Sequence, residues 1–176
     1  MRITPTAIAG VMHVHVNPHT DARGLFARTF CTDSFAAHGL ATSFPQASTS
    51  WNPHCGTLRG LHLQREPKGE AKLVRATRGR VFDVAVDLRP ASPTYLAWTG
   101  LELDSARRNA IYIPEGVAHG FLTLEPGCEV FYQMSQTYDA GLARTFRWDD
   151  PAFAIAWPAV PRIISSKDAS ARELRP

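Results

Sequence analysis

Apolar and polar residues alternate over many short stretches of the chain, and glycines and prolines separate these stretches. Successive side chains of a β-strand point to opposite faces, so this alternation is typical of strands with one buried face. The pattern predicts nine or ten strands, within residues 11–16, 25–30, 44–51, 56–64, 71–76, 81–87, 95–103, 109–113, 114–121 and 129–136.

Little of the chain shows helical periodicity. A short helix is expected over residues 34–38, with Thr32 or Asp33 as its N-cap and Gly39 after its end. A second short helix is expected near residues 167–173. Many short strands separated by turns indicate an all-β fold, an antiparallel sandwich or barrel of the jelly-roll kind. We expect one such domain over residues 1–176, with short flanking helices.

Composition narrows the function classes. The formal net charge is only +3, and the 19 lysines and arginines are spread along the chain, so nucleic acid is not an expected partner. No apolar run approaches the length of a membrane span, and the N-terminus lacks the apolar core of a signal peptide. Cys31, Cys55 and Cys128 are too far apart for a zinc site and odd in number, which favours a reducing cytoplasm.

The stretch from Gly56 to Gln64 carries the first candidate chemistry. On a regular strand, His62 and Gln64 would share a face with Gly60, and Arg59 would lie on the opposite face. A single histidine on a strand is more often a buried structural residue than a reactive one. The glycine beside His62 nevertheless leaves room for a ligand to approach it.

Two motifs, Gly56…His62 and Pro114-x-Gly116-x-x-His119, are laid out like the two motifs of cupin barrels. Gln64 stands where metal-binding cupins have a second histidine, and glutamine is a poor ligand for zinc or iron. Glu66 or Glu70 could add a carboxylate, but the ligand set is incomplete. We therefore expect no metal at this site.

His13 and His15 have the spacing of a possible metal-binding pair. An edge strand that exposes two histidines, at the surface or in an interface, is the simpler interpretation.

Without a metal, the remaining polar residues suit proton transfer. Removing a proton next to a carbonyl needs a base such as His62 and a cation such as Lys72 or Arg59 to stabilise the enolate. Inversion of the carbon also needs an acid on the opposite face, and the Tyr132 hydroxyl could serve. A carboxylate such as Asp168 would orient the histidine. Spacing alone does not show that these residues meet.

Several motifs together resemble the dTDP-4-dehydrorhamnose 3,5-epimerase family of nucleotide-sugar epimerases. The matching segments follow in family order: residues 21–26 (DARGLF), 56–64 (GTLRGLHLQ), 71–75 (AKLVR), 82–89 (FDVAVDLR), 114–121 (PEGVAHGF), 129–132 (EVFY), 148–151 (WDDP), 157–158 (WP) and 166–168 (SKD). A match spread over residues 21–168 is highly specific.

The resemblance implies a cupin jelly roll, and a homodimer in which N-terminal strands pair with the partner's sheet. It implies a nucleoside-diphosphate 4-keto sugar as substrate and no cofactor, because the ketone itself acidifies C3 and C5. The implied catalytic residues are His62 as base, Asp168 as its partner, Tyr132 as acid and Lys72 at the C4 keto oxygen. The implied substrate-binding residues are Arg23, Phe26, Gln46, Ser48, Arg59, His119, Tyr138 and Lys167, with Arg59 and Lys167 suited to a diphosphate.

Three positions depart from the family pattern. Arg28 and Ala143 stand where glutamate is frequent, and Ser48 stands where asparagine is frequent. These departures leave open the nucleotide, the sugar, and whether C3, C5 or both are inverted. A metal-dependent cupin enzyme using His62 and His119, and a cupin that only binds a sugar nucleotide, are the alternative interpretations.

Overall fold

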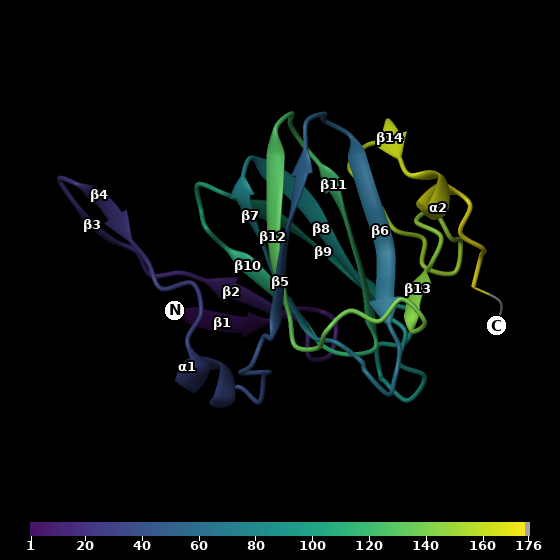
Figure 1. Ribbon diagram of the computed structural model, residues 1–176, viewed down its shortest axis with the longest axis horizontal. Helices are drawn as coiled ribbons and strands as arrows, with labels where there is room; N and C mark the ends of the chain where they lie inside the picture. The colour runs from purple at the N-terminus through teal and green to yellow at the C-terminus, as the bar shows by residue number, and fades with distance from the viewer. Residues whose placement is uncertain (175–176) are drawn as a thin grey trace.

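Two antiparallel sheets packed face to face make up most of the computed structural model, which describes residues 1–174 (Figure 1). The first sheet has the order β1 (Arg2–Pro5), β2 (Met12–His15), β10 (Ala110–Ile113), β7 (Lys72–Arg78), β12 (Cys128–Met134) and β5 (Gln46–Asn52). The second has the order β13 (Ala143–Thr145), β6 (Thr57–Gln64), β11 (Val117–Thr123), β8 (Arg80–Asp87) and β9 (Trp98–Asp104), with β14 (Ile163–Ile164) parallel to β6. The predicted cupin-type jelly roll is confirmed. Arg175 and Pro176, at the end of the expected domain, lie outside the described residues.

Apolar side chains that alternate along the strands form one core between the two sheets and another on the outer face of the first sheet. Between the sheets, β7 contributes Val74 and Ala76, and the facing strand β8 contributes Val81 and Ala85. The opposite face of β7 carries Leu73 into a second core outside the first sheet. Burial of apolar side chains stabilises the fold by roughly 25 cal/mol per Å² of apolar area, so the core between the sheets holds them together.

The first helix is shifted from its expected position, and the second is shorter than expected. Helix α1 (Thr32–Ala36) begins earlier, with Cys31 as its N-cap and no side-chain capping bond. The expected N-cap role of Thr32 or Asp33 is therefore wrong, because both residues lie inside the first turn. Helix α2 is confined to Ser166–Ala169, and its N-cap Ser165 accepts a hydrogen bond from the Asp168 N–H.

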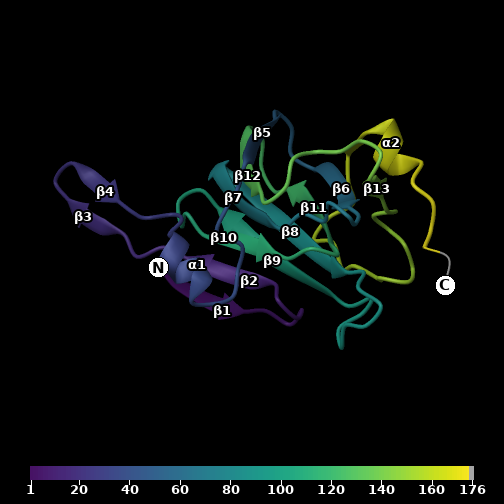
Figure 2. The ribbon, with the colours of Figure 1, turned by 60° about the horizontal axis from the view of Figure 1, so that its bottom comes forward.

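The N-terminal region forms a separate hairpin that projects from the body of the molecule (Figures 1 and 2). Its strands are β3 (His19–Asp21) and β4 (Gly24–Phe26), so the strand expected over residues 25–30 is wrong beyond Phe26. The Arg23 guanidinium pairs with the Asp21 carboxylate beside the turn. The Phe26 side chain is mostly solvent-exposed, with 73% of its surface accessible.

The rings of His13 and His15 lie against each other on β2, with centroids 3.8 Å apart. The edge strand expected here is wrong, because β2 pairs with β1 on one side and β10 on the other. The His13 Nε2 lies 3.0 Å from the Asn109 side-chain nitrogen. Burial, together with the charges of His15 and Arg2, lowers the pKa of His13 to about 4. These contacts link β2 to the residues that precede β10.

The three cysteines are free thiols. No helix within residues 1–174 is both long and apolar enough to cross a membrane. The expected cytoplasmic location stays a prediction.

Candidate active site

A β-bulge in β6 sets the direction of the central side chains. Opposite β6 on strand β11, His119 pairs with His62 and Phe121 pairs with Arg59. His119 and Phe121 are two residues apart and share a face, and directly opposite residues also share a face. Arg59 and His62 therefore point the same way although three positions separate them. The expectation that Arg59 lies on the opposite face is wrong, because the extra residue reverses the alternation.

Glycine makes this bulge possible at position 60. Gly60 has a φ of +130°, and a Cβ atom there would lie 2.5 Å from the Gly120 Cα of the facing strand. Only a residue without a side chain permits both the backbone conformation and the close approach.

His62 and Asp168 form a hydrogen-bonded pair, with 2.8 Å between the His62 Nε2 and the Asp168 Oδ1. The second carboxylate oxygen accepts a bond from the Gly60 N–H at 3.3 Å. Burial alone would raise the pKa of Asp168, but the hydrogen bond and charge of His62 lower it below its ordinary value. With Nε2–H held by this carboxylate, the Nδ1 atom of His62 carries the lone pair of a base.

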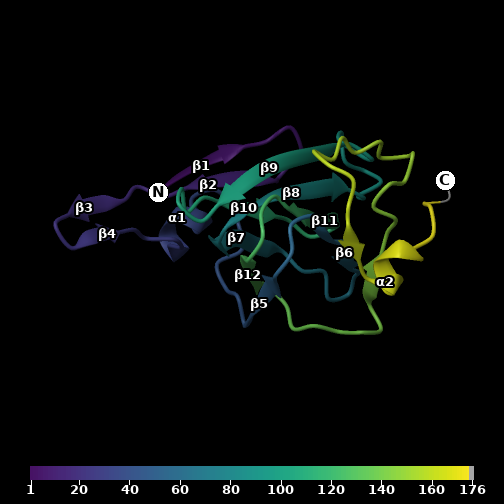
Figure 3. The same cartoon turned by 90° about the horizontal axis from the view of Figure 1, so that it is seen from above.

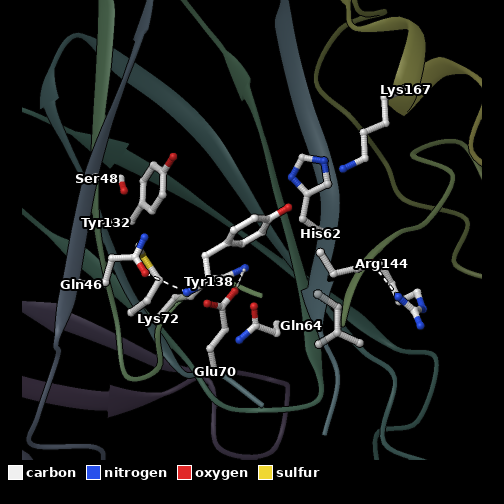
Figure 4. Close-up of a pocket in the computed structure, with 13 residues that line it drawn as sticks. Gln46, Ser48, His62, Gln64, Glu70, Lys72, Tyr132, Tyr138, Arg144 and Lys167 are labelled. Atoms are coloured by element: carbon white, nitrogen blue, oxygen red, sulfur yellow. Dashed lines mark hydrogen bonds and ion pairs between the residues drawn. The ribbon is translucent and has the colours of Figure 1, made fainter. Parts of the chain in front are cut away.

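Beside His62 lies a cavity of about 270 Å³ between the two sheets (Figure 4). The sheets diverge on this side of the molecule, between β5 and β6 (Figure 3). The lining residues are Gln46, Ser48, His62, Leu63, Gln64, Glu70, Lys72, Tyr132, Met134, Tyr138, Ala143, Arg144 and Lys167. Seven predicted site residues, His62, Tyr132, Lys72, Gln46, Ser48, Tyr138 and Lys167, are therefore brought to one cavity.

Tyr132 and His62 reach this cavity from different sheets, Tyr132 from β12 and His62 from β6 (Figure 4). Burial raises the pKa of the Tyr132 hydroxyl; the positive charge of Arg59 opposes this shift and the negative charge of Glu70 adds to it. A hydroxyl with a raised pKa stays protonated at neutral pH. A base and a proton donor thus face the same space from two sides.

Lys72 lies in the cavity, paired with one carboxylate and close enough to influence a second. Its Nζ is 3.1 Å from the Glu70 Oε1, and its charge also acts on Asp83. Asp83 is completely buried, and its Oδ2 lies 2.9 Å from the His119 Nε2. Burial raises the pKa of Asp83, against the opposing effects of His119 and Lys72. His119 is thus held behind the cavity by Asp83 and is not among the lining residues.

The Gln64 side chain forms hydrogen bonds with the loop that contains Tyr138. Its amide nitrogen donates to the Lys68 carbonyl at 2.7 Å and the Thr137 carbonyl at 3.1 Å, and its oxygen accepts from the Asp139 N–H at 2.8 Å. A side chain so fully hydrogen-bonded is structural. Tyr138 itself stands at the rim, 60% exposed, with its backbone N–H donating to the Gln46 Oε1.

Positive side chains lie on one side of the cavity and in the hollow that adjoins it. Lys167 lines both this cavity and an adjoining one that contains Arg59, His62 and Asp168. Arg59 donates from Nε to the Asn52 Oδ1 at 2.8 Å, which fixes the guanidinium in place. These cations would attract an anionic ligand to the entrance.

Two predicted site residues lie elsewhere. Arg23 and Phe26 are in the projecting hairpin, where they line only a hollow formed by the hairpin's own residues. Within one chain they do not join the other predicted site residues.

Three charged residues at or behind the cavity had no predicted part in proton transfer or substrate binding: Asp83, Arg144 and Glu70, which was considered only as a possible metal ligand. Asp83 left a signal, since it shares a strand face with the apolar residues Val81 and Ala85, and a carboxylate on a buried face needs a partner. The sequence contains no such signal for Glu70 and Arg144, because charged residues beside loops are usually solvated.

Within the described part of the chain, no group of three or more histidine, cysteine or acidic side chains is placed to hold a metal ion. The side chains at the cavity can themselves supply a base, a proton donor and a cation. Such a set is suited to moving a proton at a carbon next to a carbonyl.

The model of one protein family, described as dTDP-4-dehydrorhamnose 3,5-epimerase, matches residues 5–176. The chain belongs to this family. The epimerase of this name from Methanothermobacter thermautotrophicus is 43% identical over 99% of this chain and 95% of its own length. A dTDP-4-dehydrorhamnose 3-epimerase from Streptomyces niveus is 39% identical, over 97% of this chain and 83% of its own.

A solved structure extends the comparison from sequence to fold. The dTDP-6-deoxy-D-glucose-3,5-epimerase of Legionella pneumophila, in complex with dTDP-4-keto-L-rhamnose, superimposes with a TM-score of 0.91 and 33% identity. The match covers 98% of this chain and 92% of that one. Membership of the epimerase family makes this chain an isomerase.

Proposed function

We propose that this epimerase inverts C3, C5 or both in a nucleoside-diphosphate 4-keto-6-deoxyhexose such as the dTDP-linked sugar. The observation that carries the proposal is the pair His62–Asp168 on one side of a cavity that Tyr132 lines from the other sheet, with Lys72 in the same cavity. The names of the relatives support the same substrate class.

In the proposed reaction, His62 Nδ1 removes the proton from the carbon next to the C4 ketone. Asp168 holds the imidazole in the required tautomer and stabilises the imidazolium that forms. The Lys72 ammonium stabilises the negative charge that develops on the keto oxygen. Tyr132 then delivers a proton to the opposite face, which inverts the carbon. No cofactor is required, because the ketone itself makes the adjacent protons acidic.

The nucleotide end of the substrate would lie toward the rim. Arg59 and Lys167 are suited to the diphosphate, since both carry fixed positive charge beside the catalytic pair. His119 is expected to contact the substrate from behind the cavity. Tyr138 offers an exposed ring for stacking on a base, and Gln46 and Ser48 add hydrogen-bonding groups.

A homodimer would bring Arg23 and Phe26 to a substrate. The hairpin stands away from its own cavity, and Phe26 exposes a large apolar ring that a partner could cover. We propose that the N-terminal strands pair with the partner's sheet and that each hairpin completes the nucleotide site of the other subunit.

Heterodimers test this exchange. One chain carries His62→Ala, and the other carries Arg23→Ala together with Phe26→Ala. If each hairpin serves the partner, the purified heterodimer has one intact site and about half the wild-type activity, since a two-fold dimer has two equivalent sites. Homodimers of either variant are the controls. Activity no higher than that of these homodimers would contradict the proposed exchange.

Replacing Tyr132 with phenylalanine separates proton removal from inversion. His62 can still remove the proton and return one to the same face, so deuterium from D2O should enter the substrate while product formation falls by roughly 10²–10⁴-fold. Proton NMR of the sugar measures both quantities in one sample. Equal losses of exchange and inversion would assign Tyr132 a different role.

An experiment with a panel of substrates determines which nucleotide the enzyme accepts and how many carbons it inverts. The panel consists of 4-keto-6-deoxy sugars linked to dTDP, CDP, GDP or UDP, each incubated with the enzyme in D2O. The proposal expects exchange with at least one of them, at C3, at C5 or at both. Tight binding of these sugars without any exchange would instead support a protein that only binds sugar nucleotides.

A further inference from the structure

Glu70 is the one carboxylate among the residues lining the catalytic cavity. Its Oε1 lies 3.1 Å from the Lys72 Nζ, and only about 10% of either side chain is exposed. Figure 4 shows Glu70 beside Lys72 and Gln64 in the cavity wall. Two opposite charges removed from water in this way are strongly coupled, because solvent screens them little.

The backbone fixes this pair. Glu70 lies two positions before Lys72, the first residue of β7, and the ion pair brings both side chains to the same side of the chain. Ala71, between them, is hydrogen-bonded on both sides to Ser135: its N–H donates to the Ser135 Oγ at 2.8 Å, and its carbonyl accepts from the Ser135 N–H at 2.9 Å. The two charged groups are therefore held on a rigid segment.

No other carboxylate has a direct contact with the ammonium. Asp83 also acts on Lys72 electrostatically, but its Oδ2 is engaged by His119, and the only ion pair found for Lys72 within residues 1–174 is with Glu70. Before the substrate binds, Glu70 would therefore be the one carboxylate that holds the Lys72 ammonium in place.

We propose that Glu70 is a positioning residue for the epimerisation, which fixes the Lys72 ammonium at the place where the substrate's keto oxygen must bind. This inference rests on the proposed function and adds to it a residue that never touches the reacting carbon. Small displacements of a catalytic group cost about 10²-fold in rate. Glu70 would thus act on the chemical step, with little effect on substrate binding.

The charge of Glu70 has a second effect, on the proton donor. It contributes to the raised pKa of the Tyr132 hydroxyl, after the larger effect of burial. Removing that charge should let Tyr132 ionise at a lower pH. The alkaline limb of the pH–rate profile would then move to lower pH, a change that a purely structural role of Glu70 would not produce.

The first test observes Lys72 without any substrate. The chain has only three lysines, Lys68, Lys72 and Lys167, so NMR with ¹⁵Nζ-labelled lysine resolves each ammonium group. Burial and hydrogen bonding slow the exchange of its protons with water. We expect the Lys72 ammonium signal in the wild type and its loss in Glu70→Gln. An unchanged signal in Glu70→Gln would overturn the inference.

The second test measures kinetics. Glu70→Gln should lower kcat about 10- to 100-fold and leave KM within about three-fold, and Glu70→Asp, which keeps the charge, should recover part of the loss. Glu66→Gln is the matched control, because Glu66 lies on the same loop but lines a different cavity. A loss confined to KM, or wild-type kcat in Glu70→Gln, would contradict the positioning role.

The two tests separate failure of this inference from failure of the proposed function. A wild-type enzyme without any solvent exchange would reject the proposed function, while the ammonium signal would still decide whether Glu70 fixes Lys72.

Discussion

Alanine in place of His62 is expected to abolish deuterium exchange at the substrate carbons. Among the described residues that line the cavity, His62 is the only histidine, and the Asp168 carboxylate holds its ring. A positioned base contributes roughly 10²–10⁴-fold to such a reaction. We expect a loss near the upper end of this range, measured as the rate of deuterium uptake by NMR.

Two further variants show whether the loss of exchange is specific to the His62–Asp168 pair. Asp168→Asn should also lose most of the exchange, because an amide no longer favours the tautomer with a free lone pair on His62 Nδ1. His38→Ala is the control: His38 is exposed and its Nδ1 lies 2.8 Å from the Ser34 carbonyl oxygen on α1, away from the cavity. Retained exchange in His62→Ala would assign the base to another residue.

Alanine in place of Gly60 is expected to have the largest effect on folding. The new Cβ would lie 2.5 Å from the Gly120 Cα, and the φ of +130° disfavours any side chain. We expect the free energy of unfolding to fall by roughly 2–4 kcal/mol, since strain and overpacking act together. Urea denaturation followed by circular dichroism measures this loss.

Gly24→Ala separates the two causes. Gly24 has a similar φ of +118°, but no atom lies within 4 Å of the position its Cβ would take. This variant should therefore lose only the energy of the strained backbone. If Gly60→Ala were no less stable than Gly24→Ala, close packing against β11 could not be the reason for glycine at position 60.

Much of the fold could be predicted from the sequence because strand alternation is a local property. The strand that alternation predicts over residues 81–87 is found as β8, where Val81 and Ala85 lie in the core between the sheets. The strand expected over residues 25–30 failed beyond Phe26 because its hairpin pairs only with itself. The apolar residues Leu25 and Phe26 of this segment are exposed within this chain, so their pattern did not indicate a buried strand face.

The direction of Arg59 could not be predicted, because a bulge is a relation between two strands. Nothing in residues 56–64 alone shows that Gly60 meets Gly120 on β11. Once the bulge is present, Arg59 and His62 share a face and the neighbouring cavity contains both.

The contact between His62 and Asp168 also depends on the fold, since 106 positions separate them. Their pairing was expected from the family resemblance and not from spacing. The ion pair of Glu70 with Lys72 was missed for a different reason: the two residues are close in sequence, but burial of the loop before β7 is visible only in three dimensions.

Wild-type enzyme in D2O gives the most direct test of the central claim. The enzyme is treated with a chelator, its metal content is measured, and it is incubated with the dTDP-linked 4-keto-6-deoxyhexose while NMR follows each sugar position. We predict deuterium at C3, C5 or both, with inversion at the labelled carbon and a rate independent of added metal. Absence of deuterium at both carbons, or exchange that appears only when a transition metal is restored, would contradict proton transfer by His62 and Tyr132.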